Sequence, residues 1–155
     1  MIYEIIEQIA EKLRLIKKHR RVEIPKNATP AQRIGITGEN FAAAFYIKKG
    51  FDILERNYHQ YGAEIDIVAK NNKYYVFCEV KTTVRSPDIP NRFGRPASHV
   101  DRKQQKNIIR AASYFTHRYR NSRLRFRFDV IEVYLNEDLT LHTLHPIYNA
   151  FTADR

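Results

Sequence analysis

The sequence predicts a single α/β domain, in which a mixed β-sheet is flanked by helices. Two strand-like segments are separated by Asn71-Asn72, a dipeptide that tolerates the left-handed conformation of a tight hairpin turn. A helix-like segment follows this hairpin, and a strictly alternating strand follows the helix. With 155 residues, 43% of them hydrophobic, the chain can bury one core. A hairpin followed by a strand that is reached through a helix gives a mixed sheet with helices around it.

Residues 2–18 form the first expected helix, because apolar residues recur there at spacings of three and four. Packing against its own domain is one expectation. Self-association into a homodimer is the other, since this spacing also suits a pair of helices. Residues 19–30, with Pro25 and Pro30, are expected to be a linker. We therefore assign residues 1–33 to an N-terminal arm.

A second helix is expected over residues 38–49, with Thr37 as its cap and Gly50 as its stop. Its first turn would carry Glu39, at a position where the helix dipole favours an acid. A strand over residues 51–57 then precedes the hairpin.

The hairpin carries the chemically most informative residues. A two-residue turn at Asn71-Asn72 would place Glu64 opposite Glu79. Since side chains alternate along a strand, acidic residues from both strands then share one face. That face would carry Glu64, Asp66, Phe77, Glu79 and Lys81, and the opposite apolar face would carry Ile65, Ile67, Ala69, Val76, Cys78 and Val80.

Clustered acids on one face of a sheet are costly unless a cation neutralises them. Oxygen ligands on two neighbouring strands suit Mg²⁺ or Mn²⁺. Lys81 lies about 7 Å beyond Glu79 along the strand, within reach of a phosphate or a metal-bound water. These parts serve metal-assisted hydrolysis of phosphodiester bonds. The alternative is an exposed sheet face on which Glu79 and Lys81 form an ion pair.

The net charge is +10, and the basic residues are concentrated after the hairpin. Residues 81–127 contain thirteen Lys or Arg and two acids, whereas residues 36–80 contain five basic and six acidic residues. A basic surface beside an acid cluster suits an enzyme that acts on a polyanion; a solvated, soluble surface is the alternative. The candidate phosphate contacts are Arg85, Arg92, Arg95, Lys103, Lys106, Arg110, Arg125 and Arg127.

Most of these basic residues lie in a loop, a helix and a strand that are expected to follow the hairpin. Residues 82–97, rich in proline, are expected to form a loop that is mobile without substrate and becomes ordered on DNA. A helix capped by Ser98 would follow and extend to about residue 119. The strand over residues 123–134 offers Arg127 either to phosphate or to a salt bridge with Asp129. A short last strand is expected over residues 139–144.

Several short motifs occur in an order that resembles the YraN-like family, small bacterial proteins of uncharacterised function. The resemblance spans roughly residues 34–134 and includes an Asp followed by Glu-x-Lys, which looks like the PD-(D/E)xK nuclease signature. The motifs include Gly35-x-x-Gly38-Glu39-x-x-Ala42, Gly50-Phe51-x-Ile53-Leu54-x-Arg56-Asn57, Glu64-Ile65-Asp66-Ile67, Phe77-Cys78-Glu79-Val80-Lys81, Lys103-Gln104 and Arg127-Phe128-Asp129-Val130-Ile131.

The resemblance implies a restriction-endonuclease-like core related to Holliday-junction resolvases, here over residues 34–149, with residues 150–155 as a tail. By this resemblance Asp66 and Glu79 match the metal-binding acids, and Lys81 matches the catalytic lysine. Glu39 matches a further acid that supports the metal. Supporting roles are implied for Glu64, Lys103 and Gln104.

We therefore expect a divalent-metal-dependent DNA endonuclease that prefers branched or otherwise structured DNA and contacts mainly phosphates. A non-catalytic nucleic-acid-binding module that keeps a nuclease fold is the alternative, and an assembly factor acting through the N-terminal helix is the third. The acids in that helix argue against a signal peptide, and no apolar run approaches membrane-spanning length. With one cysteine and hence no internal disulfide, we expect a cytoplasmic protein.

Overall fold

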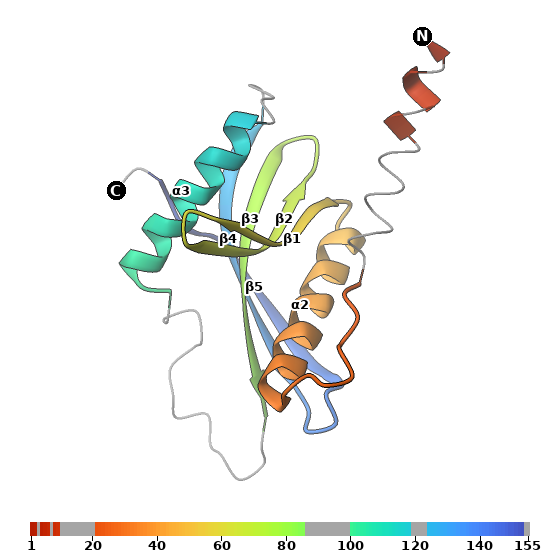
Figure 1. Cartoon of the computed structure of the whole chain (residues 1–155), viewed down its shortest axis with the longest axis vertical. Coiled ribbons are helices and arrows are strands. Elements are labelled where there is room, and N and C mark those ends of the chain that lie inside the picture. The colour runs from red at the N-terminus through yellow and green to blue at the C-terminus, as the bar shows by residue number, and fades with distance from the viewer. Residues whose placement is uncertain (3, 7, 10–20, 86–99, 119–123, 154–155) are drawn as a thin grey trace.

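The computed structural model (Figure 1) describes residues 1–2, 4–6, 8–9, 21–85, 100–118 and 124–153. Five strands form one sheet in the order β1-β2-β3-β4-β5. Strands β3 and β4 are parallel and are connected through α3, while all other neighbours are antiparallel. The predicted mixed sheet is therefore confirmed. The elements are α2 (Pro30–Lys48), β1 (Asp52–Gln60), β2 (Ala63–Lys70), β3 (Tyr74–Val84), α3 (Arg102–Arg118), β4 (Arg125–Leu135) and β5 (Leu141–Phe151).

The two helices cover opposite faces of the sheet (Figure 1). On the α2 side, Tyr46 packs with Ile67, Cys78 and Ile131. On the α3 side, side chains that include Ile108 and Phe115 pack with Phe77 and Phe128. The sheet is thus the middle of three layers, and each of its faces has its own core.

Helix α2 begins earlier than its sequence predicts. Thr29, not Thr37, is the N-cap, and it exchanges hydrogen bonds with Gln32 in a capping box. Pro30 occupies the first turn, where a missing N–H costs nothing, so this proline starts the helix instead of belonging to a linker. As a consequence Glu39 lies in the middle of α2 and not in its first turn. The predicted end is confirmed, because Gly50 adopts a positive φ of 87° directly after the helix.

The β2–β3 connection is longer than the predicted two-residue turn. The side chain of Asn71 accepts hydrogen bonds from the backbone N–H groups of Lys73 (2.9 Å) and Tyr74 (2.8 Å). Asn commonly forms such bonds in turns. Because residues 71–74 lie between the first paired positions, strand pairing begins with Lys70 opposite Tyr75. The predicted register, with Glu64 opposite Glu79, is therefore wrong by two residues. A shift of two residues does not by itself move a side chain to the other face of the sheet.

The β1–β2 hairpin bends beside Asp66. Asn57 adopts a left-handed φ of 51° and lies between the pairs Arg56–Ile67 and Tyr58–Ile65, opposite Asp66. Pairing of β2 with β3 ends at Ile67, whereas its pairing with β1 continues to Ala63. The end of the hairpin lies beside α3 in Figure 1. Ile65 consequently packs on the α3 side and Ile67 on the α2 side, so the prediction that they share a face is wrong.

Other boundaries also differ from the predictions. Strand β3 continues to Val84, so the first three residues of the predicted loop belong to a strand; residues 86–97 of that loop, with Arg92 and Arg95, lie outside the described residues, as does Ser98. Helix α3 begins at Arg102, and the carboxylate of Asp101 accepts a hydrogen bond from the Gln104 backbone. Strand β5 is longer than its predicted counterpart because it ends at Phe151.

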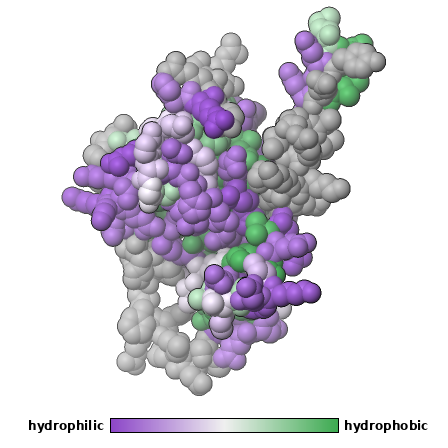
Figure 2. Space-filling view, in the orientation of Figure 1, coloured by the Kyte–Doolittle hydropathy of each residue, from purple (hydrophilic) through white to green (hydrophobic). Residues whose placement is uncertain are grey.

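The described part of the N-terminal segment is helical, as predicted for residues 2–18, of which residues 3, 7 and 10–18 lie outside the description. Figure 2 shows hydrophobic surface on this N-terminal segment. Four of its apolar side chains are each more than half exposed: Ile2, Ile5, Ile6 and Ile9. Among the described residues, no helix combines the length and apolar character needed to cross a membrane.

Candidate active site

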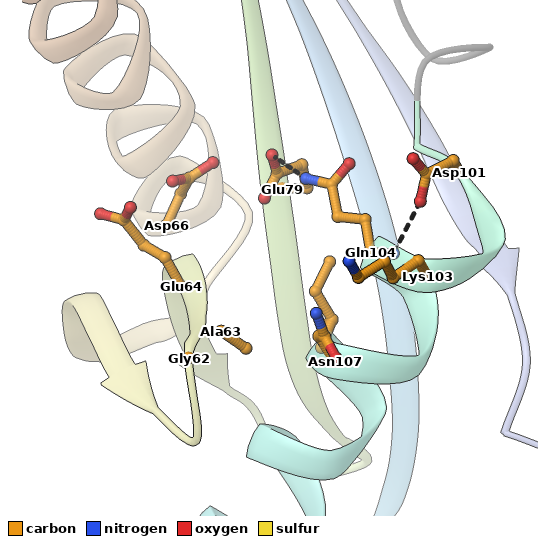
Figure 3. Close-up of a pocket in the computed structure, with 10 residues that line it drawn as sticks. Gly62, Ala63, Glu64, Asp66, Glu79, Asp101, Lys103, Gln104 and Asn107 are labelled. Carbon is orange, nitrogen blue, oxygen red and sulfur yellow. Dashed lines mark hydrogen bonds between the residues drawn. The ribbon is translucent and has the colours of Figure 1, made fainter.

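A cleft of about 300 Å³ opens between the hairpin end, β3 and the first turns of α3. In Figure 3, Glu64 and Asp66 lie on one side, and Glu79 and Gln104 lie on the other. The predicted site residues that line this cleft therefore come from three elements, β2, β3 and α3. We call it the acidic cleft; the residues that line it are Gly62, Ala63, Glu64, Asp66, Glu79, Asp101, Lys103, Gln104, Asn107 and Ile108.

Asp66 and Glu79 are both buried, although both are acids. One oxygen of Asp66 accepts a hydrogen bond from the Val80 backbone at 2.6 Å. Burial raises the pKa of the Asp66 carboxyl well above its ordinary value, and the nearby charge of Glu79 raises it further, against the hydrogen bond from Val80. The charges of Glu39 and Glu64 act in the same direction as that of Glu79. Asp66 is thus surrounded by negative charge that the described residues compensate only in part.

Glu79 is held by residues from two elements. Its Oε1 atom lies 3.1 Å from Lys81 Nζ and accepts a hydrogen bond of 2.8 Å from Gln104 Nε2. The ion pair with Lys81 was the expected alternative to a site, but Glu79 is buried in the cleft and does not lie on an exposed sheet face. Gln104, a predicted supporting residue, connects α3 to this carboxylate.

Glu39 faces Arg56 at the rim of the same region. Arg56 Nη2 lies 3.7 Å from Glu39 Oε2, and that oxygen is buried without a hydrogen-bond partner among the described residues. Burial raises the pKa of Glu39, and the positive charge of Arg56 partly offsets this effect. Arg56 also interacts electrostatically with Asp66, and its guanidinium donates to Asn40 Oδ1 at 3.3 Å.

Two residues of this region were not predicted from the sequence to take part in the site. Arg56 belongs to a family-like motif in the sequence, and that motif is the signal that could have identified it. Glu132 is buried on β4, with its Cα paired to that of Lys81, and it accepts a hydrogen bond from Tyr134. The alternating pattern of β4 predicts that Glu132 belongs to a strand. Only the parallel pairing of β3 with β4 brings it beside Lys81.

The donor set fits a divalent cation in part. Among the described residues, no three His, Cys, Asp or Glu side chains are gathered tightly enough to form a metal site by themselves. Asp66 and Glu79 nevertheless offer two buried carboxylates, and Glu39 offers an oxygen that has no hydrogen-bond partner in the described part of the chain. Hard oxygen donors of this kind suit Mg²⁺ or Mn²⁺, which keep several waters when they bind. A bound cation would also relieve the repulsion between the acids.

The predicted basic residues fall into separate groups. Lys103 lines the acidic cleft, and Lys106 and Arg110 are exposed on α3. Arg85 is exposed and lies 2.8 Å from the ring of His142. Arg125 is exposed at the start of β4, on the sheet face opposite Glu79.

Arg127 forms contacts within the fold, away from the acidic cleft. Its guanidinium lies 2.8 Å from Asp129, which confirms the expected salt bridge, and 4.8 Å from the ring centroid of Tyr148. The Asp129 carboxylate is fully buried and also accepts from the Tyr46 hydroxyl at 2.8 Å. This group lies on the α2 side of the sheet, away from the acidic cleft.

The fold and this site together describe an α/β protein with an acid-lined cleft between its sheet and a basic helix. Comparison with known proteins gives the family. The chain belongs to the uncharacterised protein family UPF0102, whose model matches residues 38–133, and the resemblance to the YraN-like family is thereby confirmed.

Relatives from several bacteria match most of the chain. A UPF0102 protein of Caldicellulosiruptor saccharolyticus is 38% identical over 120 residues, which cover 77% of this chain and 98% of the relative. A UPF0102 protein of Caldanaerobacter subterraneus is 40% identical over 119 residues, covering 76% and 93%. The residues before the matched region, including the N-terminal helix, lie outside the family model.

Proposed function

We propose that this protein is a divalent-metal-dependent endonuclease that hydrolyses phosphodiester bonds in branched or otherwise structured DNA. The observation that carries the proposal is the pair of buried acids, Asp66 and Glu79, with Lys81 in contact with Glu79. Burial of acids that repel one another is expensive, and a purely structural role would be served better by neutral residues. The restriction-endonuclease-like core belongs to the same proposal and is supported by the hairpin followed by a parallel strand after α3.

In this proposal Asp66 and Glu79 hold Mg²⁺ or Mn²⁺, with Glu39 in support. The cation would supply an activated water and neutralise charge on the phosphate. Gln104 positions Glu79 by its hydrogen bond of 2.8 Å. Lys81 is held beside Glu79, from which its ammonium can contact the phosphate oxygens that gain charge in the transition state.

The DNA contacts proposed here are to phosphates. Helix α3 supplies Lys103, Lys106 and Arg110 next to the acidic cleft, and its described residues include no acid. Contacts of this kind release counterions, so affinity should fall steeply as salt rises, by about one power of the salt concentration for each phosphate contacted. A flat response to salt would contradict this mode of binding.

The test is cleavage of labelled linear, single-stranded and four-way-junction DNA with Mg²⁺, Mn²⁺ or EDTA, beside the Glu79→Gln variant. We expect metal-dependent cleavage that the substitution abolishes, while the variant binds DNA at least as well as the wild type because a negative charge is removed. Binding without cleavage under every condition would favour the alternative, a nucleic-acid-binding module that has kept the fold.

A further inference from the structure

Two exposed tyrosines form a pair next to the acidic cleft. The rings of Tyr61 and Tyr114 lie 5.3 Å apart in an edge-to-face arrangement. Tyr61 is 59% exposed and Tyr114 is 41% exposed, so both rings keep free surface. Tyr61 directly precedes Gly62, which lines the cleft, and Tyr114 lies on α3, which forms its other wall. We call Tyr61 and Tyr114 the aromatic pair.

The backbone at Tyr61 is unfavourable for a tyrosine. Tyr61 and Gly62 are the central residues of the β1–β2 turn, flanked by the pair Gln60–Ala63, and their φ angles are 51° and 71°. Two positive φ angles define the kind of hairpin turn that favours Asn, Asp or Gly, because a β-carbon crowds the backbone there. A large aromatic side chain at this position adds strain, and strained residues cluster where ligands bind.

The aromatic pair continues a row of side chains along α3. Lys103, Asn107, Arg110 and Tyr114 are spaced by four, three and four residues, which places them on one side of the helix. Lys103 and Asn107 line the acidic cleft, whereas Arg110 and Tyr114 are exposed beyond it. At 1.5 Å per residue the row is about 16 Å long, which corresponds to about five steps of stacked DNA at 3.4 Å each.

We infer that the aromatic pair stacks on an unpaired base of the DNA strand whose phosphates follow this row into the acidic cleft. The row offers cations for the backbone and then rings for a base, which is the combination that proteins use to bind single strands. Bases inside an intact duplex present no free face to such rings. The inference rests on the proposed function and specifies its substrate class: DNA with single-stranded nucleotides beside the phosphate that is cut.

The contact between Tyr61 and Tyr114 could instead only stabilise the packing of the hairpin end against α3. An edge-to-face pair between neighbouring elements stabilises a protein without any ligand. A structural role of this kind predicts that the variants are less stable and that their affinities for all DNA substrates change equally. A stacking role predicts a selective loss for substrates with unpaired bases, so the two roles differ in a measurable way.

The test uses the full chain and fluorescein-labelled DNA of one sequence as a single strand, a forked duplex and a blunt duplex. We expect Tyr61→Leu and Tyr114→Leu to weaken binding of the single strand and the fork about tenfold, the usual effect of losing one aromatic stacking partner. Binding of the blunt duplex should change less than twofold. Tyr61→Phe, which keeps the ring, and Tyr148→Leu, an exposed tyrosine near Arg127, should bind like the wild type.

Three outcomes would overturn the inference: equal loss of affinity for all three substrates, unchanged affinity in variants that melt as the wild type does, or a change in self-association without a change in DNA binding. If Tyr61→Leu does not fold, Tyr114→Leu and the quenching of 2-aminopurine in a single strand by the wild type decide the question. Strong quenching supports stacking, and unchanged fluorescence on saturated binding contradicts it.

Cleavage by the same variants separates this inference from the proposed function. If Glu79→Gln abolishes cleavage but both leucine variants bind and cut forks like the wild type, the nuclease stands and the stacking role fails. If no substrate is cut yet the leucine variants lose single-strand affinity selectively, the stacking role stands and the nuclease proposal fails.

Discussion

Two of the buried carboxylates, Asp129 on the α2 side of the sheet and Asp66 in the acidic cleft, have different surroundings. Asp129, on the α2 side, is paired with Arg127 and also accepts hydrogen bonds from the Tyr46 hydroxyl and the Asn149 backbone. Asp66, in the acidic cleft, accepts a hydrogen bond from the Val80 backbone and lies among other acids, whose charges Arg56 offsets only in part. Burial of a carboxylate therefore has a different consequence in the two places.

The difference shows how a structural acid can be separated from a functional one. A buried carboxylate that is paired with a cation and accepts several hydrogen bonds contributes to the uniqueness of the fold. It needs no bound metal ion or added proton. A buried carboxylate among like charges destabilises the protein until a cation or a proton arrives. Perturbed acids of this second kind cluster at functional sites, which is why the proposal rests on Asp66 and Glu79.

The largest change in stability is expected at Asp129. Asp129→Ala should lower the free energy of unfolding by about 3–5 kcal/mol, because it leaves Arg127 and the Tyr46 hydroxyl without their partner. Urea unfolding measures this loss. Glu137→Ala, at an exposed site, is the control and should change little. A loss below about 1 kcal/mol would mean that the Asp129 contacts contribute little to stability.

Metal ions should produce the next largest effect, in the acidic cleft. If Asp66 and Glu79 hold a cation, Mg²⁺ or Mn²⁺ at one hundred times its dissociation constant should stabilise the protein by about 2.7 kcal/mol. Thermal melting with the ion and with EDTA measures the shift. Glu137→Ala should respond as the wild type does, and Asp66→Asn should respond weakly. Equal melting of the wild type with and without the ions would contradict the proposed site.

Asp66→Asn should stabilise the metal-free protein, in contrast to Asp129→Ala. The pKa of Asp66 is raised in the folded state, so the folded protein binds this proton more tightly than the unfolded chain does. Stability from this group is therefore present at low pH and is lost as pH rises through the folded-state pKa. Asparagine keeps an acceptor for the Val80 N–H and removes the charge.

The expected gain at neutral pH in EDTA is about 1–3 kcal/mol. The measurement is urea unfolding of both proteins across a pH series. The curves should converge at low pH, where Asp66 is protonated, and separate as pH rises. A variant that is less stable than the wild type at every pH would show that the Asp66 carboxylate is compensated after all.

The smallest effect on stability is expected from the N-terminal helix, which belongs to neither face. Removal of residues 1–20 should leave the free energy of unfolding unchanged within about 0.5 kcal/mol and should lower the mass in solution if the exposed isoleucines join two copies. Sedimentation measures the mass. The deletion must not extend further, because Val22 bonds with Asn40 and Thr29 caps α2. An unchanged mass would rule out the helix as a dimer contact.

Local patterns in the sequence determined the elements and the position of the acids along the chain. Alternation predicted the strands that carry Asp66 and Glu79, and a helix was predicted where α3 lies. These features depend on periodicity within a segment, which neighbours in the sequence are sufficient to set. The salt bridge between Arg127 and Asp129 was predictable for the same reason, since residues two apart on a strand share a face.

Only the tertiary structure decided which acids meet and what compensates them. The Asn71 turn set the register of β3, and the left-handed Asn57 turned the hairpin end and its tyrosine toward α3. Contacts between Glu39 and Arg56, or between Gln104 and Glu79, join residues from separate elements. Such contacts depend on how whole elements pack, and a pattern within one segment contains no information about a neighbour that arrives from elsewhere in the chain.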